Sequence, residues 1–160
     1  MDGQFRAGVI DGVLWKPLSL FRDPRGWLCE LFRDDETEER YRPVMAYISQ
    51  TEPGVARGPH EHVEQADYFC FFGPSTFRLF LWDNRSTSAT YQVKQVEDVG
   101  EDRPMAVVIP PGVVHAYRNV GPRPGRVFNG ANQLYKGWGR KHPVDEIRHE
   151  HDPQTLYRLE

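Results

Sequence analysis

Two histidines separated by a single residue, His60 and His62, are the first side chains in this sequence that suggest chemistry. Side chains of a β-strand alternate between its two faces, so these imidazoles share a face if the segment is extended. His115 supplies a third nitrogen donor shortly after the rigid turn Pro110-Pro111-Gly112. Three neutral imidazoles suit Zn, Fe, Ni or Mn. The non-functional interpretation is that the histidine pair is simply exposed at the edge of a strand.

Two carboxylates that could join these histidines follow the pair in the sequence. Strand alternation favours Glu64, which lies four residues after His60. Asp67 is the other candidate, and it reaches the same site only if the chain bends after His62. The spacing alone leaves both acids open.

The elements that must position these residues are short strands, because no window keeps apolar residues at helical spacing without a Gly or Pro. Turn residues separate the strands at short intervals, which is typical of a sandwich or barrel. Segment 34–41 is either a helix or a solvated loop, since charged residues dominate it. The predicted strands are 13–18, 26–32, 44–51, 65–72, 76–82, 90–96, 105–109, 113–119 and 126–135. The chain, 1–160, is predicted to form a single all-β domain.

Composition excludes several classes of partner. The 160 residues carry a net charge of -3 with no basic stripe, which argues against nucleic acid binding. No apolar run approaches the length of a membrane span, and the N-terminus lacks the features of a secretion signal, so a cytoplasmic location is expected. Two cysteines are too few for a disulfide framework.

The histidine motifs resemble those of the cupins, which combine a Gly-x5-HxH-acid-Gly motif with a later PxGxxHxxxN motif. The matching residues are Gly54, His60, His62, Asp67, Gly73, Pro110, Gly112, His115 and Asn119. The resemblance implies a double-stranded β-helix, or jelly-roll, barrel. It also implies a possible divalent metal held by His60, His62, Asp67 and His115.

A narrower resemblance, to the dTDP-4-dehydrorhamnose 3,5-epimerase branch of the cupins, extends over most of the chain. It rests on five segments in the family's order, which are DPRGWLCE, GVARGPH, WDNRSTSATY, IPPGVVHAYRN and EIRHEHDP. It implies an enzyme that removes a proton next to the carbonyl of a nucleotide-linked keto sugar and returns it from the other face. In that strict mechanism no cofactor is needed. The resemblance further implies a homodimer.

The same resemblance assigns roles to individual residues. His60 and Asp152 correspond to the family's catalytic base and its orienting carboxylate. Arg25 and Arg57 correspond to arginines that face the nucleotide diphosphate. The remaining predicted substrate-binding residues are Glu30, Asn129 and Tyr135.

Two departures from the family pattern concern the chemistry directly. Asp67 stands where the family has a lysine that stabilises the developing oxyanion, and an anion there would oppose enolate formation. Asn129 stands where the family has its catalytic tyrosine. In addition, Met45 and Tyr47 replace the Gln and Asn that read the pyrimidine.

The sequence therefore supports three hypotheses. The first is an epimerase or isomerase of a nucleotide-linked keto sugar, divergent from true 3,5-epimerases. The second is a metal-dependent cupin, an isomerase or oxygenase, in which the metal replaces the missing lysine. The third is a sugar or small-molecule binding protein without turnover. The first two compete for His60, because a metal-bound imidazole cannot also be a free base.

Overall fold

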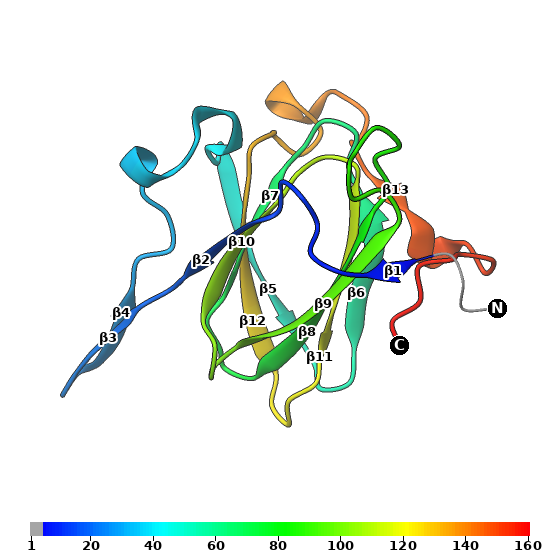
Figure 1. Ribbon diagram of the computed structural model, residues 1–160. Helices are drawn as coiled ribbons and strands as arrows, with labels where there is room; N and C mark the ends of the chain where they lie inside the picture. The colour runs from blue at the N-terminus through cyan, green and yellow to red at the C-terminus, as the bar shows by residue number, and fades with distance from the viewer. Residues whose placement is uncertain (1–4) are drawn as a thin grey trace.

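In the computed structural model, which describes residues 5–160, two β-sheets pack face to face around one core (Figure 1). The larger sheet has the strand order β1-β9-β8-β11-β6-β13, and the smaller has the order β2-β10-β7-β12-β5. The prediction of an all-β jelly roll is confirmed. The predicted domain, 1–160, includes residues 1–4, which lie outside the described residues.

The strands of the larger sheet are β1 (Arg6–Ala7), β6 (Ala56–Glu61), β8 (Thr76–Asp83), β9 (Val93–Gly100), β11 (Val113–Asn119) and β13 (Ile147–Arg148). Those of the smaller sheet are β2 (Leu14–Pro17), β5 (Met45–Thr51), β7 (Asp67–Phe71), β10 (Met105–Ile109) and β12 (Gly125–Ala131). Strands β3 (Leu20–Asp23) and β4 (Gly26–Cys29) form a separate hairpin that projects from the barrel (Figure 1). The 3-10 helices are η1 (Asp34–Glu36), η2 (Glu39–Tyr41), η3 (Trp138–Arg140) and η4 (His149–His151).

Strand β7 shows why a continuous apolar run forms a strand here. Its side chains Phe69 and Phe71 point into the core between the sheets. Tyr68 and Cys70 point to the outer face, where Leu18 and its neighbours cover them. Burying a large apolar side chain contributes about 1.5–3 kcal/mol, so a strand covered on both faces is strongly stabilised.

The predicted strands 105–109 and 113–119 coincide with β10 and β11. Strand β6 was missed because Gly58-Pro59 interrupts it and it lacks apolar alternation. The last predicted strand, 126–135, ends at Ala131. Segment 34–41 forms only the short turns η1 and η2. Among residues 5–160 no helix has the length and apolar character needed to span a bilayer.

A buried carboxylate fixes the connection between β8 and β9 at one end of the barrel. Asp83, fully buried, accepts hydrogen bonds from Arg85 Nε at 2.8 Å, Ser88 Oγ at 2.7 Å and Thr90 Oγ1 at 2.6 Å. Arg85 also donates to the Asp11 carbonyl, which ties the N-terminal segment to this loop. Burial raises the pKa of Asp83, but these hydrogen bonds outweigh it and lower the pKa to about 2.

We predict that Asp83→Asn lowers the free energy of unfolding at pH 7 by about 2–3 kcal/mol, because the amide cannot accept all of these bonds. The folded-state pKa of Asp83 is depressed, so its contribution is complete above about pH 4 and is lost as the pH falls towards 2. Urea unfolding at neutral and acidic pH measures both effects.

The matched control is Asp98→Asn, since the exposed Asp98 carboxylate pairs with Arg78 and is worth less than about 1 kcal/mol. Equal stability losses for the two variants would contradict the structural role of Asp83.

Candidate functional site

Three imidazoles meet between the two sheets at one end of the barrel. His60 on β6 lies directly opposite His115 on the adjacent strand β11, and their ring centroids are 4.4 Å apart. His62 follows the end of β6, with its ring centroid 5.8 Å from His60 and 5.9 Å from His115. The chain therefore brings the three predicted nitrogen donors together.

Asp67 completes this group from the opposite sheet. Its Oδ2 atom lies 3.1 Å from His62 Nε2 and 3.0 Å from His115 Nε2, and the residue is only 1% exposed. The chain turns after His62 and crosses to β7, so strand alternation does not extend to residue 64, and Glu64 is exposed. Ligand atoms of His60, His62, Asp67 and His115 all lie within 4.8 Å of one another. We call these four residues the histidine cluster.

A C-terminal residue holds the turn that carries His62. The Asp145 carboxylate accepts the backbone N–H groups of Val63, Glu64 and Gln65 at 2.8, 2.9 and 2.8 Å. The Asp145 carbonyl also accepts a hydrogen bond from His62 Nδ1. Sequence reasoning missed Asp145. Three successive N–H groups in a turn do require acceptors, but the sequence does not show which distant carboxylate supplies them.

Backbone carbonyls fix the ring orientations of two histidines. A carbonyl oxygen only accepts, so His62 Nδ1 carries the hydrogen that binds Asp145 O, and His115 Nδ1 carries the one that binds Val113 O at 3.0 Å. Both Nε2 atoms then face Asp67. His115 Nε2 is buried and, although close to Asp67, has no hydrogen bond of acceptable geometry. Metal-binding histidines typically donate one ring N–H to a carbonyl oxygen, which leaves the other ring nitrogen for the metal.

Charge is distributed unevenly within the histidine cluster. Burial raises the pKa of Asp67, but the adjacent imidazoles of His115 and His62 hold it well below its usual range. Burial lowers the pKa of His62, but the hydrogen bond and charge of Asp67 raise it to about 9. Burial and the neighbouring His115 lower the pKa of His60 to about 2. Without a metal, His62 and Asp67 thus form an ion pair beside a neutral His60.

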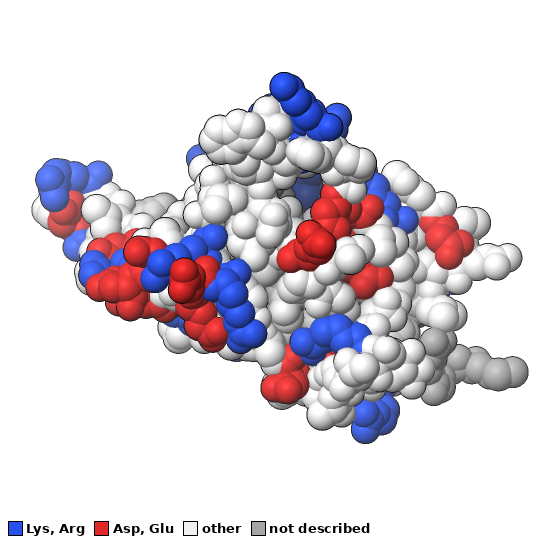
Figure 2. All heavy atoms as spheres, turned by 90° about the horizontal axis from the view of Figure 1, so that it is seen from above, with Lys and Arg blue, Asp and Glu red and all other residues white. Residues whose placement is uncertain are grey.

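A cavity of about 910 Å³ lies against the histidine cluster, within the size range of small-molecule sites. His60, His62, Phe69 and Tyr117 line its inner part together with residues of β5 and of the C-terminal segment 142–150. The charged lining residues are Arg57, Lys136, Arg148, Glu64, Asp145, Glu146 and Glu150. Figure 2, viewed from above, likewise shows acidic and basic side chains intermixed rather than one continuous basic patch.

The structure brings some of the predicted substrate-binding residues to this cavity. Arg57 and Tyr135 line it, and Arg57 is held by Thr51 Oγ1 at 2.9 Å and by the Gln50 carbonyl at 2.8 Å. Asn129 is buried behind the wall, where its Nδ2 donates to Asp67 Oδ1 at 2.8 Å. Asn129 therefore positions other side chains.

Three predicted site residues lie outside both the cavity lining and the histidine cluster. Arg25 lies at the tip of the β3–β4 hairpin, and Glu30 follows the hairpin, so neither lines the cavity. Asp152 is exposed after η4 and accepts the Gln154 N–H at 2.9 Å, because the chain turns outward there. The carboxylate of Glu146 instead faces His60, with Oε1 4.0 Å from Nε2.

Residues 8–135 match the family model described as dTDP-4-dehydrorhamnose 3,5-epimerase. The chain is 39% identical over 148 residues to the spore coat polysaccharide biosynthesis protein SpsL of Bacillus subtilis, covering 92% of this chain and 94% of that protein. It is 34% identical over 128 residues to a probable low-salt glycan biosynthesis epimerase, Agl13, of Haloferax volcanii, covering 79% and 81%.

A solved dTDP sugar isomerase from Desulfovibrio desulfuricans G20 shares the fold. The TM-score is 0.76 at 19% sequence identity, over 87% of this chain and 84% of that one. This likeness confirms the cupin-type jelly roll.

We predict that Asp145→Ala lowers the free energy of unfolding by about 2 kcal/mol, because three turn N–H groups lose a charged acceptor. Asp145→Asn keeps one acceptor oxygen and should cost less. Chemical denaturation measures both values. Asp152→Ala, an exposed carboxylate of the same segment, is the control and should stay within about 0.5 kcal/mol of the wild type. An Asp145→Ala variant as stable as that control would contradict the role of Asp145 in holding this turn.

Proposed function

The chain belongs to the dTDP-4-dehydrorhamnose 3,5-epimerase family, and from this premise we propose that it is an epimerase or isomerase of a nucleotide-linked keto sugar. The reaction would remove a proton from the carbon next to the sugar carbonyl and return one to that carbon from the other face. Such a reaction needs an unprotonated base at the wall of a cavity large enough for the sugar.

The observation that carries the proposal is the neutral imidazole of His60 at the cavity wall. Burial and His115 lower its pKa to about 2, so His60 is unprotonated at neutral pH and has a free lone pair. Glu146 faces His60 and would take the orienting role that the sequence predicted for Asp152. A carboxylate beside an imidazole stabilises the charged form that appears when the base accepts a proton.

The lost lysine has less effect on the reaction than the sequence alone suggests. Asp67 occupies the corresponding position, but it is buried behind the cavity wall and pairs with the imidazolium of His62. The pair is close to neutral, so it does not strongly oppose a developing enolate.

Three cationic side chains around the cavity, Arg57, Lys136 and Arg148, support a substrate that carries a diphosphate. Guanidinium groups match phosphate oxygens well, since they offer paired donors in one plane. Arg57 was predicted from the sequence, whereas Arg148 and Lys136 were not. We propose that these residues bind the nucleotide diphosphate while the sugar lies against His60.

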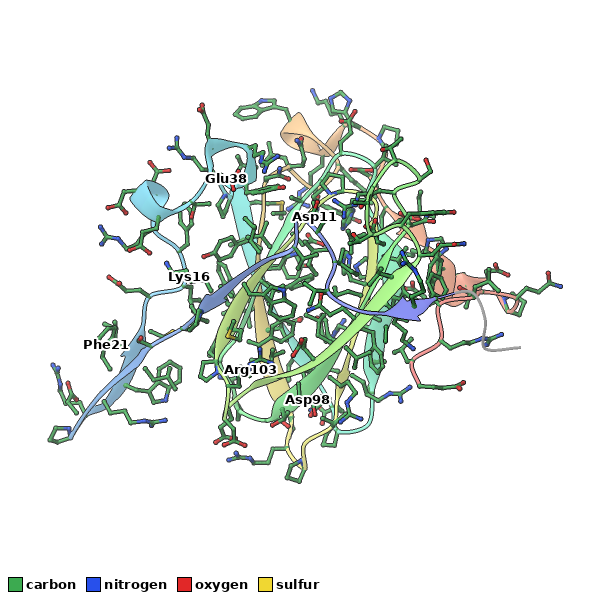
Figure 3. The ribbon with its side chains drawn as sticks, in the orientation of Figure 1. Asp11, Lys16, Phe21, Glu38, Asp98 and Arg103 are labelled. Atoms are coloured by element: carbon green, nitrogen blue, oxygen red, sulfur yellow. The ribbon has the colours of Figure 1, made fainter. Side chains whose placement is uncertain are left out.

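The projecting β3–β4 hairpin supports the homodimer predicted from the sequence. Its apolar side chains Phe21, Trp27 and Leu28 are 59%, 48% and 61% exposed, and Figure 3 shows Phe21 well away from the barrel. Exposed apolar surface of this kind marks protein interfaces. We propose that a second copy of the chain covers the hairpin, which would also give Arg25 and Glu30 a partner surface.

The proposal predicts that the protein, incubated in D2O with dTDP-4-dehydrorhamnose, incorporates deuterium at a carbon next to the carbonyl. His60→Gln should slow this incorporation by about 100-fold or more, because the base is removed. Proton NMR of the sugar follows the exchange, and His151→Gln, an exposed histidine outside the cluster, is the matched control.

No exchange by the wild-type protein with any of several 4-keto nucleotide sugars would contradict the proposed enzyme. Binding of those sugars without exchange would favour the non-catalytic binding protein.

A metal-dependent cupin is the second candidate function, and the orphaned Nε2 of His115 favours it. The buried Nε2 atom of His115, the His62 ring held by the Asp145 carbonyl and the carboxylate of Asp67 converge within 4.8 Å, so the residues fit a divalent transition metal. Zn, Fe, Ni and Mn accept this donor set. A metal bound there would supply a Lewis acid that polarises a carbonyl oxygen.

For the metal candidate we predict about one transition metal ion per chain in protein purified without an affinity tag. His62→Ala and His115→Ala should each lose it, while His151→Ala should retain it. Inductively coupled plasma mass spectrometry gives the metal content. A wild-type protein that neither contains nor takes up any of the four metals would exclude this function.

A further inference from the structure

Tyr47 presents a phenol to the cavity from the edge strand β5. Side chains alternate along this strand, so Met45, Tyr47 and Ser49 line the cavity, whereas Ile48 between them points away and is 64% exposed. In the register of the smaller sheet, Tyr47 lies directly opposite Asn129 on β12.

The amide of Asn129 fixes how the Tyr47 hydroxyl bonds. The backbone N–H of Tyr68 donates to Asn129 Oδ1 at 3.0 Å, and an N–H only donates, so Asn129 Nδ2 is the atom that faces Tyr47. Nδ2 donates to Tyr47 Oη at 3.0 Å and to Asp67 Oδ1 at 2.8 Å. The Tyr47 oxygen is thus an acceptor in this contact. In the part of the chain that the structure describes, no group accepts the hydrogen of Tyr47 itself.

We propose that Tyr47 is the proton donor that reprotonates the substrate carbon on the face opposite His60. The assignment rests on the proposed epimerase function. Tyr47 belongs to β5 of the smaller sheet, His60 belongs to β6 of the larger sheet, and both line the same cavity. A sugar ring between the sheets would have the base on one face and the phenol on the other.

The proton transfers balance in two steps. His60 takes the proton from the carbon next to the carbonyl, and the electron pair of the broken C–H bond moves into the enolate. The Tyr47 O–H bond then breaks as a new C–H bond forms on the other face, and the enolate electrons return to the carbonyl. The resulting phenolate regains a proton from water, and His60 releases its proton to water.

Two features suit Tyr47 to this role. Tyr47 is 47% exposed and lines the cavity, and burial raises the pKa of its phenol to about 12. The phenol therefore carries its proton at neutral pH. The Asn129 N–H would stabilise the phenolate that forms in the reaction, because a hydrogen bond to the charged form favours it.

The other phenols that line the cavity are less suited to this step. Tyr117 lies on β11, in the same sheet as His60. Its hydroxyl is hydrogen-bonded to Ser49 Oγ at 3.1 Å. Tyr135 follows β12, and its backbone N–H donates a hydrogen bond to Met45 Sδ. Its hydroxyl has no partner that would orient it among residues 5–160.

The test compares wild type, Tyr47→Phe and Tyr91→Phe with dTDP-4-dehydrorhamnose in D2O. Proton NMR follows two quantities: deuterium incorporation next to the carbonyl, and formation of the epimer. Tyr47→Phe keeps the ring, and thermal melting confirms that it folds. Tyr91, a tyrosine outside the cavity lining, provides the matched control and should behave like wild type in both measurements.

We expect Tyr47→Phe to form the epimer about 100-fold more slowly or worse, with KM for the sugar nucleotide little changed, while deuterium incorporation continues. His60 still removes the proton and returns a deuteron to the same face, which separates exchange from inversion. Epimer formation at the wild-type rate would overturn the assignment. A rise in KM with equal loss of both activities would show that Tyr47 only binds substrate. A wild-type protein inactive in both measurements would reject the proposed function and this assignment together.

Discussion

A single buried negative charge organises this site. Asp67 is 1% exposed between the two sheets, where an unpaired carboxylate would be strongly unfavourable. His62 bonds to one of its oxygens, and Gln65 Nε2 and Asn129 Nδ2 donate to the other at 2.9 and 2.8 Å. His115 Nε2 lies 3.0 Å away and makes no hydrogen bond among residues 5–160. The orientation of each of these side chains depends on this carboxylate.

The C-terminal segment completes the site, although the family match ends at residue 135. Asp145 binds the turn that carries His62, Glu146 faces His60, and Arg148 on β13 pairs with His60 in the larger sheet. The short strand β13 and the residue before it thereby place a guanidinium and a carboxylate at the cavity wall. The residue that holds the His62 turn and residues that line this wall of the cavity thus belong to the same short segment.

The sequence predicts the centre of the site better than its surroundings. His60, His62 and His115 could be identified because strand alternation and a Pro-Gly turn act locally, and Asp67 because it completes a spaced motif. Asp145 could not be identified from the sequence, because its contacts with the 63–65 turn form only after the C-terminal segment has folded back onto the barrel.

The same limit applies to Asp152 and Tyr47. A motif match placed Asp152 beside His60, but the turn at η4 directs it outward, and no local pattern reveals that direction. Tyr47 matched a position for pyrimidine recognition, whereas its pairing with Asn129 follows from the register of β5 and β12. The register between strands that are distant in the sequence depends on the whole sheet. Contacts set by such a register, like that of Tyr47 with Asn129, are therefore recognised only in the folded structure.

The protonation states of the histidines in metal-free protein report whether Asp67 carries the charge around which the site is arranged. Long-range proton–nitrogen NMR correlations of the imidazole rings distinguish the charged form from the two neutral tautomers. At pH 7 we expect a doubly protonated His62, titrating near pH 9, beside a neutral His60 that stays neutral well into the acid range. A neutral His62 or a charged His60 at pH 7 would contradict the arrangement of the site around a charged Asp67.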